Sequence, residues 1–410
     1  MKVLFLSQIV PYPPHGGVLQ RGYNLLRELG REARVHLLAF VHPDVLPTEA
    51  ARRESQAALE KFCETVEYFP LWPKASPVHR IAGLAASALS PRPFSVLAHR
   101  SAAFHRRVSK LVETKSFDLI HADTIALAQF IDQRWTIPTV LTHHNIESQL
   151  MERRAGAESG LFARIYLQRE TRKLLAYEAE MSGTFDVNVF VSQPDEKTLG
   201  ERVPGLRTAI VPNGVDVEYF TPSQVQDRPV LIYTGGMNMF ANRDAVIFFL
   251  NEIWPLIRKR VPDVRFFAVG QDPPKELLDL AARDPQIVVT GYVNDVRPFV
   301  WDASVYVVPL RVGGGTRLKV LDAMAMGKAM VSTSIGFEGL DVRPDEHLLV
   351  ADSPEQFAEK TVRLLQDPGR RLTLGRNARE LVEHRYSWRT IGGQLLDAYR
   401  LAMEKGRREQ

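Results

Sequence analysis

The chain of 410 residues has one cysteine, no long apolar run and little excess charge. Its single cysteine, Cys63, excludes an intrachain disulfide and a zinc site built on cysteines. No run of about 18 apolar residues occurs, so the sequence predicts no membrane-spanning helix. The N-terminal apolar run VLFLSQIV is short, and no small-residue cleavage site follows it. This indicates a buried strand and not a signal peptide, so we expect a cytoplasmic protein.

Charge and composition exclude several further classes of protein. Lys and Arg number 52 against 48 Asp and Glu, a net charge of +4, and proteins that bind nucleic acid usually concentrate positive charge on one face. We therefore expect no nucleic-acid partner. Hydrophobic residues are 45% and charged residues 24%, close to globular averages, which argues against long disordered segments. At about 150 residues per domain, the length predicts two or three domains.

Short apolar runs alternate with amphipathic ones along the chain. This alternation predicts an α/β fold with parallel sheets covered by helices on both faces. The segment 211–227, VPNGVDVEYFTPSQVQD, is rich in turn formers and is a hinge candidate. We expect one domain over 1–210, a second over 211–385, and a final helix over about 386–410 that packs back onto the first. The strands expected are 2–10, 34–40, 117–121, 138–142 and 187–191, then 229–233, 264–269, 287–290, 305–309 and 329–332.

Ligands of open α/β sheets bind at the carboxyl ends of the strands, so the residues that follow each strand are the candidates. The first strand is followed by PYPPHGG, where Gly16 and Gly17 precede a helix. Paired glycines there allow close approach of a phosphate or sugar, and the helix N-terminus favours an anion. An ordinary turn is the alternative. The spacing is not G-x-G-x-x-G, which weighs against a nicotinamide or flavin enzyme.

The segment VLTHHNIES places His143 and His144 just beyond another expected strand. A histidine there can contact a bound hydroxyl or phosphate, and its pKa responds to a neighbouring carboxylate. A histidine that only caps the strand end is the alternative. Adjacent residues of an extended chain point in opposite directions, so the pair is not expected to bind one zinc ion.

The segment VVPLRVGGGTRLKVLDAMAMGKAMVSTSIGFEGL is the most informative. Arg317 lies in the first turn of the expected helix, where positive charge opposes the helix dipole unless an anion is bound. Lys319 and Asp322 are three residues apart and share a helix face. Asp322 could accept hydrogen bonds from ribose hydroxyls, and a Lys–Asp surface pair is the alternative. Glu338 lies in a glycine-flanked turn at the same sheet edge, with a solvated loop carboxylate as its alternative.

These segments, with VPNGVD, YTGGMN, AVGQDPP and TGYVNDV between them, resemble the family 4 retaining glycosyltransferases in kind and order. The resemblance extends over nearly the whole chain. It implies the GT-B fold, in which two Rossmann-like domains carry parallel sheets that face each other across a cleft. The closer resemblance is to bacterial members that build exopolysaccharide or other surface glycans.

The resemblance also implies roles for individual residues. His144 would reach the reacting sugar, and Asp322, matching the second acid of the family's E-x7-E pattern, would hold the ribose. Arg317 and Lys319 would face the diphosphate as catalytic cations. The remaining donor-binding residues would be Gly16, Gly17, Gly235 and Gly236 near the phosphates, Tyr292 and Val293 at the base, and Gly314, Gly315, Thr316 and Glu338 around the sugar and pyrophosphate.

The sequence departs from the family pattern in three respects. Gly314 stands where the first acid of E-x7-E is expected, and the second acid is Asp322 instead of glutamate. The frequent Arg…Lys pair after the first strand of the second domain is absent, because Met237 and Asn238 occur there. Arg317 and Lys319 are the substitutes we expect for that positive charge.

The implied reaction is retaining transfer of a sugar from a nucleotide-diphosphate donor, such as a UDP- or GDP-sugar, to a hydroxyl of a glycan or lipid-linked glycan. The leaving diphosphate would accept the acceptor's proton on the same face. No D-x-D motif follows a strand, so we expect no metal and no cofactor. The alternatives are a nucleotide-sugar epimerase of GT-B fold and a non-catalytic partner of another glycosyltransferase.

Residues 68–112 contain no Asp or Glu but carry seven basic residues. We expect this stretch to contact an anionic membrane surface or a lipid diphosphate acceptor, with a solvated helix face as the alternative. The basic residues are Lys74, Arg80, Arg92, Arg100, Arg106, Arg107 and Lys110.

Overall fold

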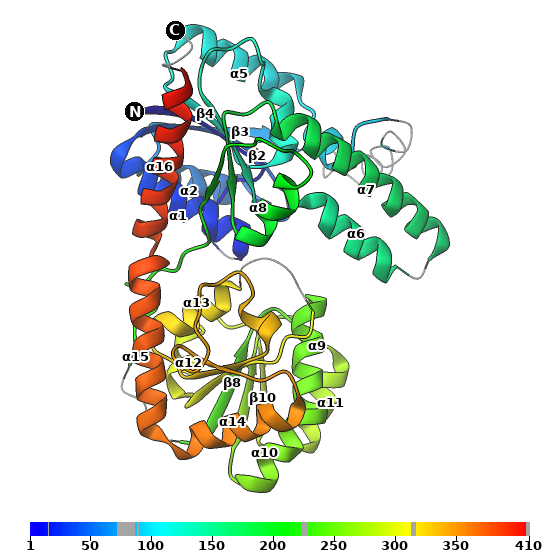
Figure 1. Cartoon of the computed structure of the whole chain (residues 1–410), viewed down its shortest axis with the longest axis vertical. Coiled ribbons are helices and arrows are strands. Elements are labelled where there is room, and N and C mark those ends of the chain that lie inside the picture. The colour runs from blue at the N-terminus through cyan, green and yellow to red at the C-terminus, as the bar shows by residue number, and fades with distance from the viewer. Residues whose placement is uncertain are drawn as a thin grey trace. The chain divides into compact units, whose positions relative to one another are not determined.

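The computed structural model describes residues 1–14, 16–71, 87, 90–158, 160–223, 228–312 and 317–406. The chain forms two compact units. The N-terminal unit comprises Met1–Pro212 and the chain from Ile391 on, and the C-terminal unit comprises Asn213–Thr390. The sequence expectation placed the division after residue 210, just before the turn-rich segment, and the end of the second domain at residue 385. Each unit is built on one parallel sheet (Figure 1).

The N-terminal unit has a seven-stranded sheet of order β3-β2-β1-β4-β5-β6-β7 in which every pairing is parallel. The strand order reverses between β1 and β4, so residues just after these strands lie at a topological switch point. The strands are β1 Lys2–Ser7, β2 Arg34–Val41, β3 Thr65–Pro70, β4 Leu119–Ala122, β5 Thr139–His143, β6 Val187–Phe190 and β7 Thr208–Ile210.

Helices cover this sheet, and two of them, α6 and α7, lie side by side and extend away from it (Figure 1). The last helix, α16, packs on α1, because a Cβ at Gly392 would lie 2.5 Å from Cβ of Glu28. The helices are α1 Gly17–Glu32, α2 Glu49–Leu59, α4 Phe94–Ala98, α5 Ala102–Thr114, η2 Ile125–Phe130, α6 Glu147–Ala157, α7 Leu161–Ser182, α8 Gln193–Gly200 and α16 Trp388–Gly406.

The C-terminal unit has a six-stranded parallel sheet of order β10-β9-β8-β11-β12-β13. The strands are β8 Val230–Thr234, β9 Arg265–Val269, β10 Ile287–Gly291, β11 Val305–Val308, β12 Met330–Ser332 and β13 Leu349–Val350. The helices are α9 Phe240–Phe248, α10 Trp254–Arg260, α11 Lys275–Arg283, α12 Arg297–Asp302, α13 Leu318–Ala325, η4 Ser334–Phe337, α14 Pro354–Gln366 and α15 Pro368–Arg385. The two parallel sheets confirm the α/β class expected from the sequence.

The helical stretch between β8 and β9 is not one continuous α-helix. A π-helical turn, η3 Phe249–Ile253, separates α9 from α10. Pro255 at the start of α10 explains the break, because proline lacks the N–H that a continuous helix would use and crowds the carbonyl four residues earlier. The first strand is also shorter than expected, since β1 ends at Ser7 and not at residue 10.

Candidate functional site

At the carboxyl edge of the N-terminal sheet, the glycine loop opens α1. Gly16 is the N-cap residue with φ 87° and ψ 164°, a conformation that residues other than glycine rarely adopt. No side chain caps α1, and its first turn contains no acidic residue. The backbone N–H groups at this helix end, starting with that of Gly17, suit an anion.

His143, the last residue of β5, and His144, which follows it, point in opposite directions, as the sequence predicts. His143 Nε2 lies 3.0 Å from Asn188 Oδ1, and its ring stacks on Phe190 with centroids 4.8 Å apart. Burial lowers the pKa of His143 to about 4, so this imidazole is neutral and structural. His144 points the other way, with its Nε2 3.3 Å from Asp123 Oδ1.

Asp123 is a candidate site residue that the sequence analysis missed. It follows β4 directly, and its side chain is only 2% exposed. Burial raises the pKa of Asp123, but the charges of His144, His121 and Arg21 act against it, and the net pKa is lowered. The group is therefore a buried carboxylate beside the His144 ring.

Two residues whose charges act on Asp123 are themselves fixed by hydrogen bonds. Arg21 of α1 is 1% exposed and donates to the carbonyl oxygens of Val211 and Pro212 at 2.8 and 2.7 Å. His121 on β4 contacts the Tyr399 hydroxyl of α16 at 2.5 Å and Thr142 Oγ1 at 2.7 Å. Burial lowers the pKa of His121 to about 4, so it is neutral. Arg21 thus links α1 to the chain after β7, and His121 links β4 to β5 and α16.

At the carboxyl edge of the C-terminal sheet, Lys319 of α13 lies against the loop that follows β8. Its Nζ donates to the Tyr233 hydroxyl at 2.8 Å and to Asn242 Oδ1 at 2.6 Å. The Asn242 side chain in turn donates to the carbonyl of Gly236 at 2.8 Å. A Cβ at Gly235, where φ is 151°, would lie 2.5 Å from Lys319 Nζ. Burial, and then the charge of Arg317, lower the pKa of Lys319 to about 7.

Asp322 lies one turn further along α13. Its Oδ1 is buried and has no hydrogen-bond partner among the described residues. Burial raises the pKa of Asp322 to about 8, because nothing compensates the cost of desolvating the carboxylate. Lys319 and Asp322 share a helix face as expected, but Lys319 bonds to Tyr233 and Asn242 instead. The alternative of a simple Lys–Asp surface pair is therefore wrong.

The other residues expected at the donor site follow neighbouring strands of the same sheet. Arg317 was expected in the first turn of the helix, but it is the N-cap residue, one position before α13 begins. Tyr292 comes directly after β10 and is 64% exposed, whereas Val293 packs against the core. Glu338 follows η4 and is exposed, which agrees with a solvated carboxylate. Gly314, Gly315 and Thr316 lie outside the described residues.

The carboxyl edge of the C-terminal sheet thus gathers the ends of β8, β10, β11 and β12. It carries a half-buried ammonium group and a half-buried carboxyl group, and burial shifts the pKa of each toward its neutral form. Such a pair can bind a ligand with both an anionic part and hydroxyl donors. Among the described residues, no group of three or more His, Cys, Asp or Glu side chains could hold a metal ion.

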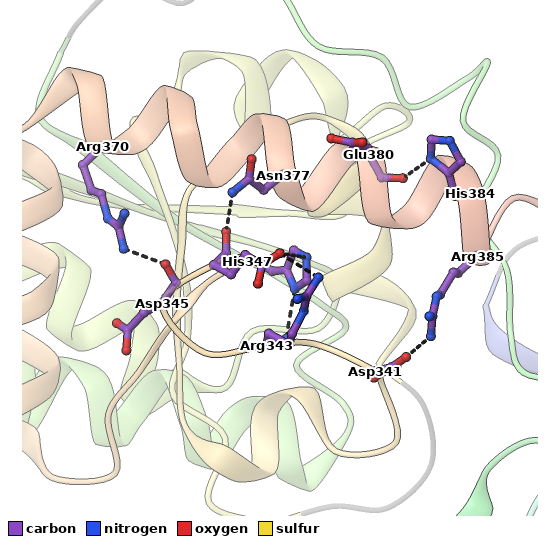
Figure 2. Close-up of polar contacts among 10 residues, drawn as sticks. Asp341, Arg343, Asp345, His347, Arg370, Asn377, Glu380, His384 and Arg385 are labelled. Carbon is purple, nitrogen blue, oxygen red and sulfur yellow. Dashed lines mark hydrogen bonds and ion pairs between the residues drawn. The ribbon is translucent and has the colours of Figure 1, made fainter.

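A second polar cluster in the C-terminal unit lies between the loop before β13 and α15 (Figure 2). It borders a cavity of about 300 Å³. Two ion pairs lie in it: Arg343 contacts Glu346 at 2.7 Å, and Arg385 contacts Asp341. His347 Nδ1 accepts from the Arg343 backbone N–H at 2.9 Å. These contacts attach the loop to the helix, and no group of the cluster was expected in the site.

Two family models match the chain. The model described as Glycosyltransferase Family 4 matches residues 15–219, and the model described as glycosyl transferases group 1 matches residues 228–367. The chain belongs to glycosyltransferase family 4. The resemblance found from the sequence motifs is therefore confirmed, and the chain is a glycosyltransferase.

Relatives extend over different shares of the chain. A 44.6 kDa protein of the cps region of Klebsiella pneumoniae, named as uncharacterized, is 22% identical over 95% of this chain and 97% of its own length. A D-inositol 3-phosphate glycosyltransferase of Saccharomonospora viridis is 26% identical over 72% of this chain and 73% of its own. A GDP-mannose-dependent phosphatidylinositol monomannoside mannosyltransferase of Corynebacterium glutamicum is 25% identical, over 45% of this chain and 54% of its own.

Solved structures share the fold. Sucrose-phosphate synthase from Thermosynechococcus elongatus superposes with a TM-score of 0.65 at 19% identity, covering 99% of this chain and 100% of the other. HepE of Anabaena, in complex with UDP, superposes with a TM-score of 0.65 at 18% identity, covering 97% and 99%. The GT-B fold expected from the motifs is confirmed. Among the described residues, no helix is both long and apolar enough to span a membrane.

Proposed function

We propose that this glycosyltransferase moves a sugar, with retention of anomeric configuration, from a nucleotide-diphosphate sugar to a hydroxyl of a glycan or lipid-linked glycan, in bacterial polysaccharide biosynthesis. The pairing of Lys319 and Asp322 on one face of α13 carries this proposal. A nucleotide sugar has the two features that these buried groups lack: a diphosphate for the ammonium, and ribose hydroxyls for the carboxylate.

The proposed donor pose follows from the loops around these two groups. Lys319, held against the backbone at Gly235 and Gly236, would contact the diphosphate, and Arg317 would add a second positive charge from the start of α13. Asp322 would accept hydrogen bonds from ribose hydroxyls, and the loop at Tyr292 would hold the base. The Asn242 side chain bridges Lys319 and the glycine loop, because it accepts from Lys319 and donates to the carbonyl of Gly236.

Asn242 accounts for a departure from the family pattern. The segment after β8 lacks the usual cations, yet Lys319 of α13 reaches Asn242 in that segment and Tyr233 on β8. Positive charge is therefore supplied at the β8 loop by another helix. A cation held in a partly dehydrated loop stabilises charge that develops on a leaving diphosphate more strongly than one in water.

In the proposed reaction, the bond between the anomeric carbon and the diphosphate oxygen breaks while the acceptor oxygen bonds to the same face of that carbon. The acceptor's proton passes to the departing diphosphate. Lys319 and Arg317 stabilise the negative charge there, and no metal ion or cofactor takes part. The roles of His144, Gly16 and Gly17 in contacting the donor, which the family resemblance implies, remain part of the proposal.

A panel of UDP- and GDP-sugars tests donor binding by thermal stabilisation. A ligand at about 100 times its dissociation constant adds about 2.7 kcal/mol to the free energy of unfolding. We expect one donor to stabilise the wild-type protein and K275M, a control at an exposed lysine of α11, but not K319M. Lack of stabilisation by any nucleotide sugar would contradict the proposal.

Nucleotide release with and without a glycan acceptor then separates the activities. Transfer requires acceptor-dependent release with the anomeric configuration kept. Acceptor-independent conversion of the sugar would indicate an epimerase. Donor binding and nucleotide release both absent would indicate a non-catalytic partner.

The expectation that residues 68–112 contact a membrane falls partly on residues 72–86, 88 and 89, which lie outside the described residues; Lys74 and Arg80 are among them. In the described part, Arg107 on α5 is already paired, with two contacts of 2.6 Å to Glu67 on β3. We propose that the protein contacts anionic lipid peripherally. The α6–α7 hairpin, described below, supports this contact better than residues 68–112 do.

A further inference from the structure

The α6–α7 hairpin has an unusual distribution of polar and apolar side chains. At its base, Glu178 of α7 is fully buried and accepts from the backbone N–H and the hydroxyl of Ser148 on α6, at 3.1 and 2.5 Å. Near the middle of α7, Glu170 is 1% exposed and accepts from Ser87, from the Phe94 backbone and from Lys173. Glu178 thus joins the two helices of the hairpin, and Glu170 holds α7 to Ser87 and Phe94 outside it.

The tip of the hairpin shows the reverse pattern. Leu161, Phe162 and Ile165, in the first turns of α7, are 66%, 87% and 54% exposed. Leu161 and Ile165 are four residues apart and adjoin on the helix surface, with Phe162 beside them. A cluster of bulky apolar side chains that remains in water at the end of a projecting element marks an interaction surface.

Positive charge surrounds this apolar cluster. Between residues 152 and 172, five arginines are exposed, while the only acidic residues that are not buried are Glu152 and Glu158. The arginines are Arg153, Arg154, Arg164, Arg169 and Arg172. Arginines around exposed aromatic and aliphatic side chains match the interface of an anionic bilayer, where apolar groups enter the acyl boundary and cations meet phosphate headgroups.

We propose that the tip of the α6–α7 hairpin inserts into the interface of an anionic membrane. α6 begins only three residues after His144, so the hairpin extends from the same sheet edge as the Asp123–His144 pair. If the proposed function holds, membrane binding by the hairpin implies that the acceptor is a glycan carried on a lipid. Only this implication rests on the proposed function. Membrane binding itself requires no substrate.

Co-sedimentation of the full chain with vesicles, without nucleotide sugar, tests the proposal. We expect binding to phosphatidylcholine vesicles that contain phosphatidylglycerol, and binding that weakens as salt is added. The variant L161S/F162S/I165S should lose at least about tenfold in affinity, since it removes the apolar contact. R153Q/R154Q should lose about tenfold on anionic vesicles only.

Matched controls are available at other exposed positions. Leu372 on α15 is 75% exposed and the Arg53 side chain on α2 is 78% exposed, so L372S and R53Q should bind vesicles as the wild type does. All of these substitutions are at exposed positions, so melting temperatures should stay unchanged. Tip variants that bind as tightly as the controls would overturn the proposal, as would a wild-type protein that ignores anionic vesicles.

A labelled protein gives an independent measurement. Burial raises the pKa of the native Cys63 thiol to about 12, and this side chain is 4% exposed, so thiol reagents should modify only the new cysteine of F162C. An environment-sensitive dye there should shift to the blue on anionic vesicles. If the dye responds to protein concentration instead, and the tip variants change the sedimentation coefficient, the surface binds a second copy and the membrane proposal fails.

The two proposals can fail separately. Donor binding is measured by calorimetry without vesicles, and vesicle binding without donor. Loss of donor binding in K319M with normal vesicle binding leaves the hairpin proposal intact. Absence of vesicle binding with normal donor binding overturns the hairpin proposal alone.

Discussion

Replacement of Lys319 by methionine should stabilise the folded protein near neutral pH and destabilise it at high pH. The pKa of Lys319 is lowered from 10.5 to about 7 in the folded protein. The unfolded chain therefore binds more protons between pH 7 and pH 10.5, and stability rises with pH over that range. The penalty for this lysine is complete below about pH 7 and disappears above about pH 10.5.

The size of the effect follows from the same shift. At about 1.36 kcal/mol per pKa unit, desolvation of Lys319 costs the apo protein about 4 kcal/mol near pH 7. Methionine removes this cost and also the two hydrogen bonds to Tyr233 and Asn242, worth about 1 kcal/mol each. We therefore expect apo K319M to be about 2 kcal/mol more stable than wild type at pH 7, and about 2 kcal/mol less stable near pH 10.5.

Calorimetric melting of both proteins without ligand, across pH 6 to about pH 10.5, measures this difference. Asp322 titrates in both proteins, so its contribution cancels when the two are subtracted. K275M, at an exposed lysine, should follow the wild type at every pH. If the stability difference between K319M and wild type stays constant with pH, desolvation of Lys319 does not cost the apo protein free energy. The inference that a diphosphate relieves such a cost would then be refuted.

Three further substitutions test neighbouring parts of the site. G235A should abolish donor binding and lower the free energy of unfolding by about 1–3 kcal/mol, because its Cβ would collide with Lys319; equal donor affinity would contradict this. The raised pKa of Asp322 makes stability fall as pH rises from about 4 to about 8, so D322N should flatten this decline in apo melting curves while weakening donor binding; an unchanged curve would count against it. D123N should lower kcat at least about tenfold in the wild type but little in an H144A background, as measured by a double-mutant cycle; additive losses would show that Asp123 does not act through His144.

Strand and helix patterns were readable from local sequence where apolar residues repeat without interruption. The runs before Gly235 and His144 became β8 and β5 with boundaries shifted by one residue. The long helix α7 was missed because its buried face carries Glu170 and Glu178, so hydrophobic periodicity does not mark it. The edge strands β3 and β7 were missed because many of their residues are only partly buried.

The motifs located the candidate residues but not their partners. Order and spacing along the chain were enough to place Lys319, Asp322 and His144 after strands of parallel sheets, since such strands end at one edge. They did not indicate Asp123, which has no motif of its own, or the role of Asn242. Those residues are recognisable only when their neighbours are known.

Local sequence thus specified the alternation of strands and helices, the family and the sheet edges that carry chemistry, because these depend on patterns over a few residues. Folding alone decided that Lys319 contacts Tyr233 and Asn242, 86 and 77 positions away, and leaves Asp322 without a partner among the described residues. It also decided that Asp123 lies beside His144. The reason is physical: burial and hydrogen bonding depend on which side chains meet across adjacent strands, and a carboxyl or ammonium group acquires its pKa only in that environment.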